Sequence, residues 1–153
     1  MLGRIGKITV GLAAGALVVA GLGTAGSTAT YKVSASLNAK QEIPKQVVKV
    51  PNATGSFSGT YVEHGKTATL KWKLTYSHLS GAAMQAHIHL GKTGVSGNVI
   101  VPLCAGNCRS GLTGTAKITS KVVAQMEAGK TYVNVHTAKN PAGEIRGQVK
   151  VTG

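Results

Sequence analysis

Two histidines separated by one residue, His87 and His89 in the stretch AHIHLG, are the side chains of this sequence best suited to chemistry. Apolar and polar residues alternate over residues 84–90, which predicts a β-strand with every second side chain on the same side. Ile88 then faces the core, and both imidazoles leave on the opposite face. Neutral imidazole binds copper and zinc, so the pair is part of a candidate metal site; the alternative is a solvated polar face.

A third histidine, His136, lies in another predicted strand, residues 131–137, and its parity also directs it outward. In the last predicted strand, residues 144–151, the same alternation directs Glu144 and Arg146 outward. If these strands are neighbours, their outer faces gather the three histidines, the glutamate and the arginine. Such a placement requires a specific topology, which makes it more informative than the HxH pair alone.

Three neutral imidazoles suit copper, with zinc as the second choice, and leave a position open for water or an anion that Arg146 could hold. Glu144 is expected to pair with Arg146 or to support a histidine from behind. His64 and His78 stand at predicted turns, where we expect them to be solvated. Either would become an extra ligand only if its loop folds over the site. No residue is assigned a catalytic role, because the sequence has no aspartate, no nucleophile-elbow pattern and no paired carboxylates.

The two cysteines, Cys104 and Cys108, stand in the stretch CAGNC. In an exported chain a disulfide is the default for such a pair, and it would staple a short loop. A thiolate metal site is the alternative, but it lacks a second cysteine pair.

Eight short segments with period-two alternation and turn residues between them predict an all-β fold, an antiparallel Greek-key sandwich or barrel. One helix is predicted at residues 119–130, capped by Ser120 and ended by Gly129. The predicted strands are residues 31–38, 55–63, 67–76, 84–90, 98–103, 111–118, 131–137 and 144–151.

The first residues have the order of a secretory signal: Arg4 and Lys7, an uncharged apolar run, then small residues. We expect a signal peptide over residues 1–29, cleaved near Ala25 or Ala29, and a secreted, periplasmic or cell-surface domain over residues 30–153. An uncleaved anchor is the alternative; after cleavage no transmembrane segment is expected.

Without Arg4 and Lys7, 15 basic residues remain against four acidic ones. This excess attracts anions, such as anionic polymers of a cell envelope. The lysines are scattered along the sequence and aromatic residues are few, which argues against specific nucleic-acid binding.

Several motifs resemble the CHRD (chordin-type) domain. They are AHIHLGKTGVSGNVIVPL and YVNVHTAKNPAGEIRGQV, together with LNAKQEIP and ATGSFSGTY nearer the N-terminus. The resemblance covers roughly residues 31–151. It implies an antiparallel β-sandwich in a secreted or surface protein, and it does not define a molecular activity.

The order of elements is more distantly similar to that of Cu,Zn superoxide dismutases, which have an HxH pair on the fourth strand and a copper-binding histidine late on the seventh. His87, His89 and His136 match these positions, and the resemblance implies that Arg146 lies near the metal. No histidine occurs between His89 and His136, so the metal-bridging histidine has no counterpart, and the zinc ligands are absent as well. The resemblance therefore carries over a three-histidine copper site and not a complete dismutase site.

The sequence thus predicts a secreted domain with a mononuclear copper site of His87, His89 and His136, serving copper carriage or redox chemistry. One alternative is a metal-free extracellular interaction or structural module. Another is a basic envelope protein that binds polyanions. Dismutase activity is a separate alternative, weakened by the missing bridging histidine.

Overall fold

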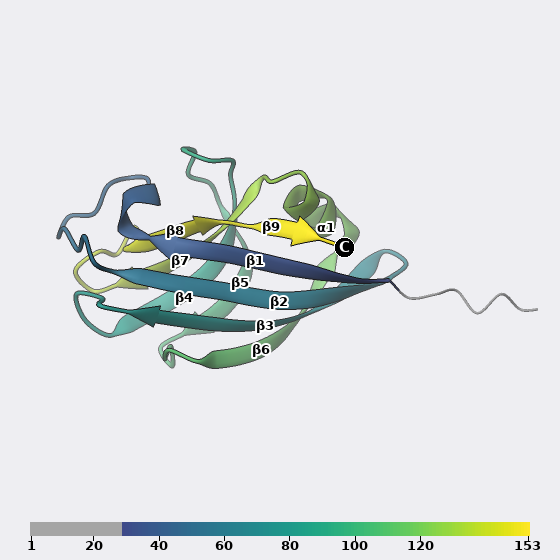
Figure 1. The fold of residues 1–153 in the computed structure, drawn as a ribbon, viewed down its shortest axis with the longest axis horizontal. Coiled ribbons are helices and arrows are strands. Elements are labelled where there is room, and N and C mark those ends of the chain that lie inside the picture. The colour runs from purple at the N-terminus through teal and green to yellow at the C-terminus, as the bar shows by residue number, and fades with distance from the viewer. Residues whose placement is uncertain (1–28) are drawn as a thin grey trace, which may run out of the picture.

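Within residues 29–153, the part of the chain that the computed structural model describes, nine β-strands surround one hydrophobic core, with one α-helix and one 3-10 helix (Figure 1). Their bounds are β1 Thr30–Asn38, η1 Ala39–Gln41, β2 Thr54–His64, β3 Thr67–Ser77, β4 Ala83–Leu90, β5 Val99–Ala105, β6 Leu112–Thr119, α1 Ser120–Glu127, β7 Thr131–Thr137, β8 Ile145–Gln148 and β9 Lys150–Thr152. Apart from Ala29, the predicted signal peptide lies outside the described residues. Neither helix of residues 29–153 is long and apolar enough to cross a bilayer.

Strand β3 shows how the alternating sequence produces this fold. Leu70 and Leu74 are fully buried, whereas Lys71 and Lys73 between them are exposed. One face of the strand therefore packs on the core and the other faces water, as a half-buried antiparallel strand requires.

The strands form one antiparallel sheet in the order β5-β4-β7-β8-β1-β2-β3-β6, with β9 paired to β1. This sheet curls into a nearly closed barrel, with β1, β2 and β3 in front of β4, β5 and β7 in Figure 1. The chain crosses between distant parts of the sheet from β3 to β4 and, through α1, from β6 to β7. The predicted all-β Greek-key class with one short helix is confirmed.

Two details differ from the prediction. The last predicted strand is divided: β8 pairs with β7, and after Val149 the chain leaves that partner and continues as β9 beside β1. The helix is capped by Thr119, whose side chain accepts a hydrogen bond from the backbone of Val122, and not by Ser120. In both places a segment takes a hydrogen-bond partner other than the one predicted, while the alternation of apolar and polar residues stays as predicted.

Much of the outer face of β4, β7 and β8 is covered, which argues against the alternative of a solvated polar face. His89, Asn134 and Arg146 lie on this face and are all at most 8% exposed. They are covered by the loop of residues 91–98 and by the segment of residues 39–53, through hydrogen bonds such as the one from Asn134 to Glu42. The sheet is therefore buried on both faces at these three residues, whereas His87 and His136 on the same outer face are half-buried.

Candidate metal centre

Strands β4 and β7 bring the three predicted histidines onto one face. The strands pair directly, with Gln85 opposite His136 and His87 opposite Asn134. Residues that are directly opposite in an antiparallel pair point to the same side, and the diagonal neighbours are within reach of long side chains. His136 is thus diagonal to His87, and β4, β7 and β8 are neighbours, which was the condition for a shared site.

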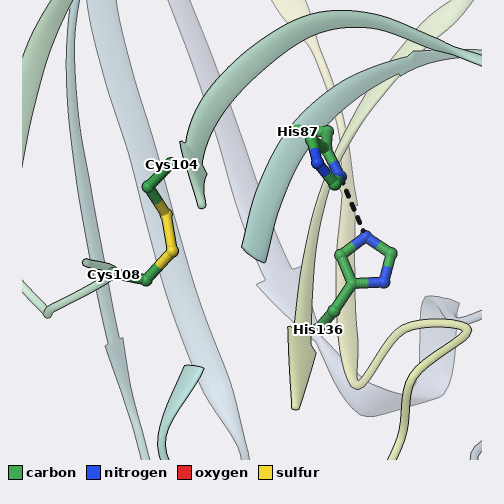
Figure 2. The surroundings of a disulfide bond; sticks show 4 residues. All are labelled: His87, Cys104, Cys108 and His136. Carbon is green, nitrogen blue, oxygen red and sulfur yellow. Dashed lines mark hydrogen bonds between the residues drawn. A yellow bond between two sulfur atoms is a disulfide. The ribbon is translucent and has the colours of Figure 1, made fainter. Parts of the chain in front are cut away.

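The imidazoles converge closely. One ring nitrogen from each of His87, His89 and His136 lies within 4.8 Å of the others. The shortest approach, 3.2 Å, joins Nδ1 of His87 to Nε2 of His136, and Figure 2 shows these two rings pointing toward one another. Two nitrogens about 2.0–2.1 Å from one metal are about 3.4 Å apart at a tetrahedral angle, so the widest pair would have to close by up to roughly 1.4 Å. That is a side-chain adjustment and requires no change of strand pairing.

Backbone carbonyls orient two of the rings. Nδ1 of His89 is 2.9 Å from the carbonyl oxygen of Gly97, and Nδ1 of His136 is 3.0 Å from that of Pro141. A carbonyl only accepts hydrogen bonds, so each Nδ1 carries the proton and each Nε2 keeps a free lone pair. Metal-binding histidines are commonly held in this way by a partner on the other ring nitrogen.

The orientation of the His136 ring also determines which ring nitrogen of His87 carries the proton. Since Nε2 of His136 is an acceptor, Nδ1 of His87 donates the proton in their 3.2 Å contact. Moving that proton to Nε2 of His87 would free a third lone pair. The resulting donor set is Nδ1 of His87 with Nε2 of His89 and of His136, three nitrogens of the kind that copper and zinc prefer.

Nε2 of His89 is buried and has no hydrogen-bond partner among the described residues. A buried acceptor without a partner costs free energy, and most native structures avoid it. A metal ion at this atom would remove that cost, so the residues present fit a bound metal.

Burial keeps these imidazoles neutral. Desolvation, with the neighbouring rings of His136 and His89, lowers the pKa of His87 to about 4. Burial also lowers the pKa values of His89 and His136, outweighing the opposite effect of their carbonyl hydrogen bonds. Neutral imidazole is the metal-binding form, so protons compete less here than at a solvated histidine.

Tyr132 and Arg146 complete the wall beside His89. The ring of Tyr132 stacks on that of His89 with centroids 4.9 Å apart, and the guanidinium carbon of Arg146 lies 3.4 Å from the Tyr132 centroid. Because β7 lies between β4 and β8, the tyrosine is sandwiched between the histidine and the arginine.

Arg146 acts on the loop of residues 91–98. Its Nη2 donates to the carbonyls of Lys92 and Val95, at 3.0 and 2.9 Å. At the other end of the loop, the amide of Gly97 donates to the hydroxyl of Tyr132. The expected arginine is therefore next to the site, but its Nη2 holds the loop that orients His89. Its Nη1 has no hydrogen-bond partner among the described residues.

Glu144 lies away from the histidines. Its carboxylate accepts hydrogen bonds from Ser80, Thr137 and Asn140, which tie the β3–β4 connection to the end of β7. Burial alone would raise the pKa of Glu144, but these hydrogen bonds hold it below its usual value. Glu144 was expected to pair with Arg146 or to support a histidine. Its carboxylate instead anchors the β3–β4 connection to the end of β7.

The other predicted candidates also lie outside the cluster. His64 and His78 are exposed at turns and do not join the group, within the part of the chain that is described. Cys104 and Cys108 form the predicted disulfide. Cys104 is paired with Ala86 and packs in the core, so the bridge lies on the opposite side of the sheet from the histidines (Figure 2).

Sequence reasoning missed a buried carboxyl group beside this site. Glu42, in the segment after η1, is fully buried and accepts a hydrogen bond of 2.6 Å from Asn134. Desolvation raises its pKa to about 7, although hydrogen bonds from Ile43 and Asn134 and the charge of Arg146 act against this rise. The residue stands in a proline-containing loop without periodicity, so alternation gives no signal for it.

Comparisons with known proteins agree with part of the sequence-based prediction. The CHRD domain family matches residues 33–149. Chordin from Xenopus laevis is 30% identical over 114 residues, which cover 69% of this chain and 12% of Chordin. No solved structure matches the chain significantly. The expected resemblance to CHRD domains is confirmed, and the likeness to Cu,Zn superoxide dismutases is not confirmed by these comparisons.

Proposed function

We propose that this chain, which belongs to the CHRD family, is an extracellular module that binds one copper ion through His87, His89 and His136. The observation that carries the proposal is the buried, unpaired Nε2 of His89, next to two imidazole nitrogens that can turn toward the same point. The CHRD match supports the extracellular placement. Because the chain spans only 12% of Chordin, the activity of that whole protein is not transferred to it.

The donor set favours copper over the other first-row divalent ions. Sites made of imidazole nitrogens bind Cu²⁺ more tightly than Zn²⁺ or Ni²⁺ in the usual order of affinities. Three ligands leave a position open, and His87 and His136 are only half-buried, so a small ligand can reach the metal. The metal would supply a Lewis-acidic or redox-active centre, and the chain would hold it in place through the two carbonyl-oriented rings.

Metal content of the exported protein tests the proposal. Elemental analysis of the natively exported chain should find about one copper per molecule. A variant with His87→Ala and His89→Ala, purified in the same way, should lose it, whereas one with His64→Ala and His78→Ala should keep it. An exported protein without metal, or one whose metal survives the first pair of substitutions, would favour the metal-free interaction module.

A further inference from the structure

A second surface of the molecule, far from the histidines in the strand order, consists of lysines and hydroxyl side chains. Register places paired residues of β9, β1, β2, β3 and β6 on one outward face, since directly opposite side chains share a side. We call this the lysine–hydroxyl face; its lysine and hydroxyl members are Lys32, Ser34, Ser36, Ser56, Ser58, Thr60, Thr69, Lys71, Lys73, Thr75, Thr113, Thr115, Lys117, Lys150 and Thr152, and Val62 lies beside Thr69.

The side chains of this face stand in rows across the strands. One row runs Thr152–Lys32–Thr60–Lys71–Thr115, and the next runs Lys150–Ser34–Ser58–Lys73–Thr113. With strands about 4.8 Å apart, each row is roughly 19 Å long. In each row lysines thus stand on both sides of a hydroxyl residue of β2, which Ser34 of β1 joins in the second row.

The face is hollowed along these rows. A shallow groove of about 810 Å³ is lined by Lys32, Lys71 and Lys73 together with hydroxyl residues from β1, β2, β6 and β9. The hollow is open, and its lining residues span the strands of both rows, so a linear chain can contact the lysines and hydroxyls along a whole row.

No acidic residue neutralises the lysines of this face. Of the four glutamates in the sequence, Glu42 and Glu144 are buried beside β7 and β8, and Glu127 accepts a hydrogen bond from Tyr61. Glu63 stands at the end of β2, where it pairs with Ala68 outside the face defined above. A groove lined by one sign of charge concentrates ions of the opposite sign.

The composition of the face indicates which polyanion fits. The one aromatic residue that lines the groove, Trp72, is only 7% exposed, so it presents no ring face on which nucleic-acid bases could stack. The serine and threonine hydroxyls of the face both donate and accept hydrogen bonds, which matches the hydroxyl groups of sugars, while the lysines match carboxylates. We propose that the lysine–hydroxyl face binds an acidic polysaccharide, a linear polymer of uronic acid residues.

Titration with polygalacturonate tests this proposal. Binding by the mature chain should be measurable at low salt and should weaken steeply as ionic strength rises, because exposed charges are screened. A variant with Lys32→Gln, Lys71→Gln and Lys73→Gln should bind at least tenfold more weakly. A matched variant with Lys49→Gln, Lys121→Gln and Lys139→Gln loses the same charge from exposed positions elsewhere and should change by less than threefold.

Further measurements distinguish a specific polysaccharide groove from general attraction of anions. His136→Ala should bind the polymer like the wild type, so a failure of the copper proposal leaves this result unaffected. Equal losses in the two lysine variants would show that net charge alone attracts the polymer and would overturn the proposal. Equal or tighter binding of oligo(dT), or of vesicles containing anionic lipid, would overturn it as well.

Discussion

His89 donates its Nδ1 proton to the carbonyl oxygen of Gly97, 2.9 Å away, and thereby directs its unpaired Nε2 into the position of the proposed metal ligand. The relationship depends on a glycine at position 97. A Cβ atom there would overlap the carbonyl oxygen of Leu90, which belongs to the backbone and cannot move aside. The loop of residues 91–98 can therefore cover His89 only while residue 97 has no side chain.

Gly97→Ala should accordingly weaken copper binding without removing a ligand. We expect a loss of about 10–100-fold in affinity, the usual range when the partner of a metal-binding histidine is lost. Calorimetric titration with Cu(II) measures this effect. Gly81→Ala is the matched control, because a Cβ at that position meets nothing within 4 Å. Equal affinities of the two variants would show that the carbonyl of Gly97 does not orient the ligand.

Copper binding should persist to lower pH than a solvated histidine site allows. The sequence alone predicts that binding fades near about pH 6.5, where free imidazoles become protonated. Burial lowers the pKa values of all three histidines, that of His87 to about 4, so proton competition begins only at lower pH. The midpoint of the affinity loss should therefore lie clearly below about pH 6.

A synthetic peptide of residues 84–91 is the control for this pH dependence. Its histidines are solvated, so it should lose its copper near about pH 6.5. A midpoint shared by peptide and protein would show that the histidines of the protein are not desolvated.

We expect Glu42 to make the metal-free protein less stable as pH rises. Its pKa is about 7 in the folded state and near its usual value in the unfolded chain, so the folded state binds more protons between these values. The contribution of Glu42 to the free energy of unfolding is therefore fully present below about pH 4.5. It is lost as pH rises through 7, and the total loss is roughly 3 kcal/mol.

Glu42→Gln should remove this dependence. The uncharged amide needs no proton to stay buried, and Asn134 can present its unpaired Oδ1 to it. Urea unfolding at about pH 5 and about pH 8 measures the change: the wild type should lose stability relative to the variant at the higher pH. Glu63→Gln, at an exposed position, should follow the wild type. Parallel curves for wild type and Glu42→Gln would contradict a raised pKa.

Alternation in the sequence is sufficient to find the strands and the side on which each histidine lies. His87 and Ile88 occupy opposite faces as predicted, since side-chain parity is a local property of a strand. The predicted helix cap is one residue late, because Thr119 and Ser120 are both competent caps and only the fold selects between them.

Burial of the histidine face could not be predicted in the same way. The loop of residues 91–98 and the segment of residues 39–53 have no apolar period, so nothing local shows that they fold back over β4 and β7. The prediction for Glu144 is wrong for a related reason: this residue precedes β8, and its carboxylate turns toward Thr137 instead of following the parity of Arg146. Such features depend on contacts between residues distant in sequence.

The central claim is that three imidazoles share one metal, and calorimetric titration of His136→Ala with Cu(II) tests it most directly. The metal-free wild type should bind one copper per chain. His136→Ala should bind at least tenfold more weakly, because a two-histidine pair on a single strand remains, while the exposed control His64→Ala should match the wild type. Equal copper affinity for wild type and His136→Ala would contradict the three-histidine site.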